Sequence, residues 1–255
     1  MLQPGRELES QGRSVSGVDW RTVGLLGAIF VVVALLWGTV LVTPLKIFVV
    51  LLHEVSHALA TWLTGGEVLR IEVNAMQGGL CVSRGGNSFV VLSAGYLGSM
   101  LWGATLLILA ARTRLDRWLS VGIGLFLIGV TLLFVRNLFG FFFAGLSGAA
   151  MIVIGLKLPE KVNDLILKVI GVTSCLYAVL DIIDDVLRRP GIGSDADQLA
   201  RLTHIPSMVW GVLWIVLALV VTGIALWIAA AGDGRPATEP VIGKGSVGSR
   251  LPGRS

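Results

Sequence analysis

Charged residues are scarce in this chain. Asp, Glu, Lys and Arg make up 14% of the 255 residues, whereas 55% are hydrophobic. Soluble globular domains carry about 25% charged residues, so this composition excludes an ordinary soluble domain. The mean hydropathy is +0.84, and long apolar runs recur along the chain. The sequence therefore predicts an integral membrane protein with the lipid bilayer as a partner.

Cysteine is also rare. Cys81 and Cys175 are the only two, too few for a disulfide framework or a cysteine metal site. The net charge of +4 suits anionic lipid head groups and gives no argument for nucleic acid binding. The ends, residues 1–20 and 232–255, are polar and rich in glycine, so we expect disordered tails around one domain at 21–231.

The apolar runs predict the fold class. We expect an all-α polytopic membrane protein with about six to seven transmembrane helices, near residues 23–42, 45–64, 89–111, 118–135, 138–156, 162–187 and 208–231. The first run is too long for a signal-peptide core, so we interpret it as a retained span. Between the second and third spans, residues 67–73 alternate apolar and polar side chains, and residues 80–83 follow two glycines. This period predicts a short β-hairpin.

The second span contains the pattern H-E-x-x-H, formed by His53, Glu54 and His57. On a helix, residues four apart lie on one face, so the two histidines can present imidazole nitrogens to one metal ion. Glu54 lies beside that position, where a carboxylate can take a proton from metal-bound water. Ionisable side chains are costly within a span and mark function. The pattern therefore indicates a catalytic metal site.

Such a site needs a third ligand, and the sixth span offers carboxylates. Asp181, Asp184 and Asp185 fall at i, i+3 and i+4, hence on one face of that helix. Clustered carboxylates repel one another unless a cation balances them, and a metal held by the histidines would do so. Asp195 and Asp197 follow Ser194 in a polar segment, so we interpret them as helix-capping residues. His204 precedes Pro206 and is expected at the surface.

Together these motifs resemble the site-2 protease family of intramembrane zinc metalloproteases, and more narrowly its peptidase M50B-like branch. The resemblance rests on H-E-x-x-H in a membrane helix, the hairpin after it, Ala94-Gly95-Tyr96-Leu97-Gly98, and Asp-x-x-Asp-Asp followed by Ser194-Asp195-Ala196. The Gly-Pro-x-x-Asn pattern of better-known members is replaced here by Gly95-Tyr96-Leu97-Gly98.

The resemblance implies a zinc ion held by two histidines and one aspartate, and a zinc-bound water activated by a glutamate. Carried over by position, His53 and His57 are ligands and Glu54 is the base. Asp181 is the favoured third ligand because it matches a Leu-Asp pair and lies deepest in the apolar stretch; Asp184 and Asp185 are the alternatives. The implied substrate is a transmembrane protein or peptide, and the implied location is a bacterial cell membrane.

Two other hypotheses fit part of the pattern. In a membrane transporter or ion-coupled protein, the histidines and aspartates would form a proton or metal pathway, which requires further polar residues along a path. The fourth and fifth spans supply almost none. In a non-catalytic membrane scaffold, the metal would serve stability alone, and Glu54 would have no role in hydrolysis.

Overall fold

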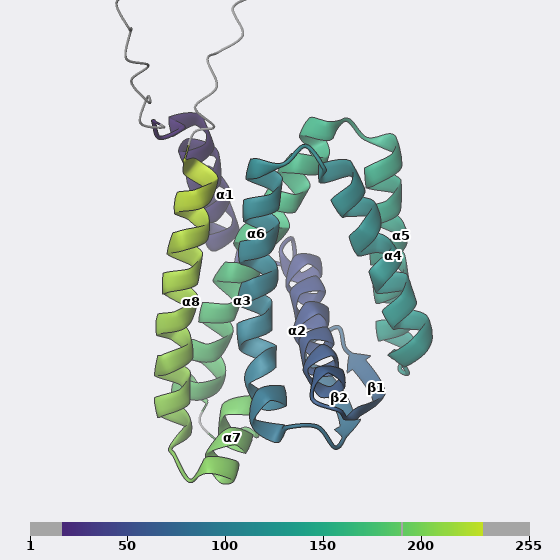
Figure 1. Cartoon of the computed structure of the whole chain (residues 1–255), viewed down its shortest axis with the longest axis vertical. Helices are drawn as coiled ribbons and strands as arrows, with labels where there is room; N and C mark the ends of the chain where they lie inside the picture. Colours follow the sequence, from purple (N-terminus) through teal and green to yellow (C-terminus); the bar gives the residue numbers. More distant parts are fainter. Residues whose placement is uncertain (1–16, 190, 232–255) are drawn as a thin grey trace, which may run out of the picture.

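The computed structural model describes residues 17–189 and 191–231. Both predicted tails lie largely or wholly outside these residues. The described chain forms eight α-helices, one π-helix and two strands (Figure 1). In chain order they are α1 (Trp20–Leu35), α2 (Thr43–Leu63), β1 (Glu67–Val73), β2 (Gly79–Arg84), α3 (Ser88–Arg112), α4 (Asp116–Phe134), α5 (Leu138–Lys157), α6 (Glu160–Ile182), the π-helix η1 (Ile183–Arg188), α7 (Asp195–Thr203) and α8 (Ser207–Ala230).

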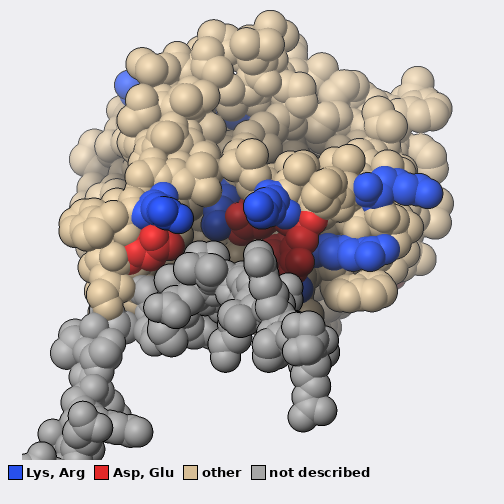
Figure 2. Space-filling view, turned by 90° about the horizontal axis from the view of Figure 1, so that it is seen from above, with Lys and Arg blue, Asp and Glu red and all other residues tan. Residues whose placement is uncertain are grey.

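Six of these helices are long and apolar enough to cross a membrane: α2, α3, α4, α5, α6 continued by η1, and α8. The chain is thus a multi-pass, mostly helical membrane protein with one small hairpin, and the predicted fold class is confirmed. The ends of the helices carry charged turns. Figure 2 looks at the end where α3 meets α4 and α5 meets α6, and it shows Lys, Arg, Asp and Glu side chains gathered there.

The first predicted span is too long. A helix over residues 23–42 was expected, but α1 has 16 residues and ends at Leu35. Residues 36–42 form turns, in which the Thr39 hydroxyl donates to the Leu36 carbonyl. Pro44 lies in the first turn of α2 and does not terminate the helix before it, because proline at the start of a helix lacks only an N–H that would be unpaired anyway. In Figure 1, the upper end of α2 consequently lies below the upper ends of α3 and α8.

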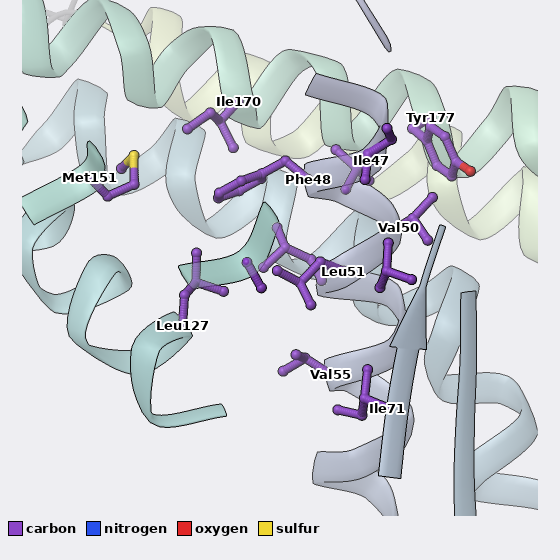
Figure 3. Packing of buried hydrophobic residues seen from close by; sticks show 14 of the residues in the cluster. Ile47, Phe48, Val50, Leu51, Val55, Ile71, Leu127, Met151, Ile170 and Tyr177 are labelled. Carbon is purple, nitrogen blue, oxygen red and sulfur yellow. The ribbon is translucent and has the colours of Figure 1, made fainter. Parts of the chain in front are cut away.

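α2 is the central helix of the bundle, with α3 and α6 on one side and the α4–α5 pair on the other (Figure 1). Within its apolar window 78% is buried inside the structure, compared with 22% for α8. Figure 3 shows Phe48 and Leu51 of α2 among Leu127 of α4, Met151 of α5 and Ile170 of α6. Protein therefore surrounds α2 where lipid surrounds the outer helices, which permits polar groups along it.

The hairpin pairs β1 with β2 in antiparallel fashion, and its turn is closed by Asn74, whose side chain accepts from the backbone N–H groups of Met76 and Gly78. The other edge of β1 is bound by the loop before α5. There the Asn137 amide bonds both the N–H and the C=O of Val73, and the Arg136 N–H donates to the Ile71 carbonyl. The outer edge of β2 has neither a strand nor such a loop bridge along it among the described residues.

Candidate metal centre

Two imidazoles and one carboxylate converge beside α2. The Nε2 atoms of His53 and His57 each lie 3.1 Å from the same atom, Oδ2 of Asp195. The three residues are the one group of metal-ligating side chains within the described chain whose donor atoms all lie within 4.8 Å of one another. His53 and His57 lie four residues apart on one face of α2, as the sequence predicts. The carboxylate comes from α7.

The sequence favoured Asp181 as the third member of this group, with Asp184 and Asp185 as the alternatives. None of them belongs to the cluster that the structure forms. Asp181 and Asp185 line the same cavity from α6 and η1. Asp184 and Asp185 accept hydrogen bonds from Arg189, at 2.5 Å and 2.7 Å. α2 and α6 are in contact, but this contact brings none of these three carboxylates into the histidine cluster.

Asp195 was interpreted as a capping residue, but the structure places its carboxylate in the histidine cluster instead. The N-cap of α7 is Ser194, and a capping box joins it to Asp197. A capping box uses the N-cap and the third helical residue, so Asp197 does cap the helix as predicted. The carboxylate of Asp195, at the first helical position, is left available and turns toward the histidines. Because the capping box does not use Asp195, the sequence already indicated that this carboxylate is free for another role.

The surroundings of His57 determine which of its nitrogens faces the cluster. Its Nδ1 lies 2.7 Å from the carbonyl oxygen of Val91 in α3, so the Nδ1–H donates there and the Nε2 lone pair points at Asp195. A lone pair facing a carboxylate oxygen is repulsive unless a proton or a cation lies between them. A backbone carbonyl behind a histidine is the usual support of a metal ligand.

Gly95 keeps the space beside both nitrogens open. A Cβ at this position of α3 would lie 2.3 Å from the His53 Nε2 and 2.5 Å from the His57 Nε2, closer than any non-bonded contact allows. The donor set of two imidazoles and one carboxylate is typical of a catalytic zinc ion. The geometry and the chemistry of these three side chains therefore fit a metal ion.

Glu54 is buried, 5% exposed, and faces the hairpin. A Cβ on Gly79 would lie 2.3 Å from the Glu54 Oε1, and the backbone of Cys81 hydrogen-bonds the carboxylate. Burial, with Glu54 and Asp195 nearby, raises the pKa of the Cys81 thiol to about 12.

Asp195 remains ionised in this environment. Its burial disfavours the charged form, but when the two imidazoles are protonated, their positive charge and hydrogen bonds outweigh that effect and hold the pKa of the Asp195 carboxyl well below its usual range. The third histidine takes no part. His204 is the exposed C-cap of α7, in left-handed backbone with φ of 60°, which confirms its predicted surface position.

A cavity of about 830 Å³ gives access to the cluster. Its walls come from α2, the hairpin from Met76 to Ser83, the start of α3, the end of α6 with η1, and the start of α7. His53, Glu54, His57 and Asp195 all line it. The unpaired edge of β2 therefore borders the same space as the candidate metal ligands.

The comparison with protein families agrees with this arrangement. A family model described as Peptidase M50B-like matches residues 26–225, a range that contains every element of the cavity. The comparisons with curated proteins and with solved structures gave no match. Because the family model covers well over half of the chain, the chain belongs to the peptidase M50B-like branch of the site-2 protease family.

Proposed function

We propose that this protein is an intramembrane zinc metalloprotease, which hydrolyses peptide bonds of membrane-embedded substrates. One observation carries the proposal: His53 and His57 of a membrane helix meet Asp195 of α7 beside a buried glutamate, and all four side chains line an 830 Å³ cavity. Membership of a peptidase family supports the same reaction class.

In this proposal His53, His57 and Asp195 hold the zinc ion. When bound, zinc lowers the pKa of a coordinated water to about 7 and polarises a carbonyl group. The chain itself supplies the proton transfer. Glu54 accepts a proton from the attacking water and returns it to the amine that leaves when the peptide bond breaks. The hairpin holds the Glu54 carboxylate in place through Gly79 and the backbone of Cys81.

The substrate would bind as an extended strand along β2. A peptide bond inside a helix is shielded, so a transmembrane segment must unwind before water reaches its backbone. The outer edge of β2 has no strand partner among the described residues and borders the cavity. Adding a strand there satisfies the backbone hydrogen bonds of an unwound segment, which is β-augmentation. We therefore propose a transmembrane protein or peptide as substrate, consistent with the earlier expectation.

The test compares wild type with Glu54→Gln and Asp195→Ala, all purified in detergent. Zinc content is measured by mass spectrometry, and cleavage is measured on β-casein and on synthetic single-span peptides of leucine and alanine with a central glycine pair. We expect Glu54→Gln to retain zinc and lose cleavage, and Asp195→Ala to lose both. A wild type that binds no zinc, or a Glu54→Gln variant that cleaves normally, would show that the proposal is wrong.

The same comparison separates the protease from the two other hypotheses. A transporter or a metal-stabilised scaffold holds its metal without cleaving either class of substrate. A zinc-loaded wild type with no cleavage of β-casein or of any peptide would therefore favour those functions over the protease.

A further inference from the structure

The acidic motif at the end of α6 needs an explanation, since none of its aspartates joins the histidine cluster. Asp185 differs from its neighbours in its contacts. Its Oδ2 accepts a hydrogen bond of 3.1 Å from the Tyr96 hydroxyl, and its Oδ1 accepts one of 2.7 Å from Arg189. Asp184 shares only the contact with Arg189. Asp185 alone of the three thus connects η1 to α3, next to Gly95.

Tyr96 carries this connection to the cluster. Its ring contacts the imidazole of His53 in a T-shaped arrangement, with centroids 5.1 Å apart and planes at 85°. Trp214 of α8 packs on it at 5.2 Å, and Tyr96 is only 2% exposed. The ring is therefore wedged between His53 and α8. The hydroxyl bond to Asp185 anchors its far end, because a phenol buried in this way needs a partner.

His53 depends on this wedge more than His57 does. His57 is oriented by its own hydrogen bond to the Val91 carbonyl. The contacts described for His53 are the Nε2 contact with Asp195 and the ring contacts with His57 and Tyr96. A ligand is held in its binding rotamer by the groups that pack against it, and outside the cluster the ring that packs against His53 is that of Tyr96.

We propose that Asp185 is a positioning residue of the metal centre, acting on His53 through the hydroxyl and ring of Tyr96. This inference rests on the proposed function, because it assumes that His53 holds a metal. In this proposal Asp185, the last residue of the Asp-x-x-Asp-Asp motif, supports a metal ligand and does not bind the metal itself. The Arg189 contact ties Asp185 to the residue that follows η1, so the carboxylate is itself fixed in place.

The experiment measures metal binding by the full chain in detergent, using zinc affinity by chelator competition and the visible spectrum of the cobalt-substituted protein. Asp185→Ala and Asp184→Ala are a matched pair, because both remove a partner of Arg189 and only the first removes the acceptor of Tyr96. We expect Asp185→Ala to weaken zinc binding by roughly 10- to 100-fold and to change the cobalt spectrum, the usual effect of losing a supporting group. Asp184→Ala should leave both unchanged.

Two further variants separate positioning from folding. Tyr96→Phe keeps the ring beside His53 and removes the hydroxyl, so it should weaken zinc binding as Asp185→Ala does. Asp185→Asn keeps an acceptor oxygen and should restore the affinity and the spectrum. If Asp185→Ala fails to fold, this pair decides the question alone.

The failures are distinguishable. A wild type without metal affinity contradicts the proposed function. Normal wild-type binding together with an unchanged cobalt spectrum in Tyr96→Phe, or equal effects of Asp184→Ala and Asp185→Ala, contradicts the positioning role and leaves the proposed function intact.

Discussion

Gly95→Ala is the smallest change expected to remove the metal centre. Gly95 lies inside α3, where alanine normally stabilises a helix by about 1 kcal/mol. Here the added Cβ would meet the His53 Nε2 at 2.3 Å and the His57 Nε2 at 2.5 Å. Both imidazoles must therefore move by about 1 Å to reach ordinary contact distances of about 3.5 Å, and they cannot do so while keeping one metal position.

The magnitude follows from the cost of overpacking. An extra methyl group in a packed site costs about 1–3 kcal/mol, which corresponds to roughly 5- to 150-fold in zinc affinity. Without metal the imidazoles can rotate away, so the metal-free protein should unfold at an unchanged or slightly higher temperature. The expected signature is thus a loss of zinc-dependent stabilisation with no loss of basal stability.

The assay is thermal unfolding in detergent with and without zinc, together with chelator competition. Gly129→Ala is the matched control, because a Cβ at that position of α4 meets nothing within 4 Å. It should bind zinc as wild type does. If Gly95→Ala also bound zinc with wild-type affinity, the metal would not lie between the two Nε2 atoms, and the assignment of this centre would be refuted.

Three further predictions concern the surroundings of the site. Gly79→Ala would place a Cβ 2.3 Å from the Glu54 Oε1 and should lower kcat by ~100-fold with unchanged zinc content, since a displaced catalytic group loses about that much. Asn137→Ala removes both side-chain bonds to Val73 and should lower the free energy of unfolding by about 2 kcal/mol, measured by thermal denaturation. For Asp197, burial favours the neutral form, but hydrogen bonds at the start of α7 outweigh it and lower its pKa. Its contribution is therefore present above the unfolded pKa of about 3.9 and lost as the pH falls through the folded pKa. Asp197→Asn should cost about 1 kcal/mol at pH 7, and progressively less in acid unfolding measurements.

What the sequence predicts correctly here is mostly local. The spacing of His53 and His57 determines their common face, because an α-helix repeats every 3.6 residues. The alternation in residues 67–73 predicts β1, and the run of apolar residues predicts each long helix. The break after Leu35 was missed because hydropathy measures solvent preference and does not distinguish a helix from the turns that the structure shows at residues 36–42.

The third carboxylate could not be predicted in the same way. Asp181 was preferred for its depth in an apolar stretch, but depth indicates only that a charge needs a partner. Asp181 lies beside Tyr177, one helical turn earlier. The position of the Asp195 carboxylate, by contrast, depends on how α7 packs on α3 and α8, and no local period encodes that packing. The capping box of Ser194 and Asp197 can be recognised in the sequence. Asp195, at the first helical position, is not needed for it, and this was the one sequence feature that pointed to Asp195 as a site residue.

The three proposed ligands come from helices that are buried to different degrees, and this difference affects how the site is assembled. His53 and His57 belong to the most buried span of the bundle, so their separation is set before any metal binds. Asp195 sits at the start of the nine-residue α7, which packs on α3 and α8. A metal held by all three joins α7 to α2 through bonds that the packing alone does not provide. α3 contacts both histidines, through Gly95, the Tyr96 ring and the Val91 carbonyl. A bound metal would therefore link α2 and α7, and α3 packs against both of these helices. The Ala-Gly-Tyr segment therefore belongs to the site as much as the histidines do, through the space that it leaves and the ring that it supplies.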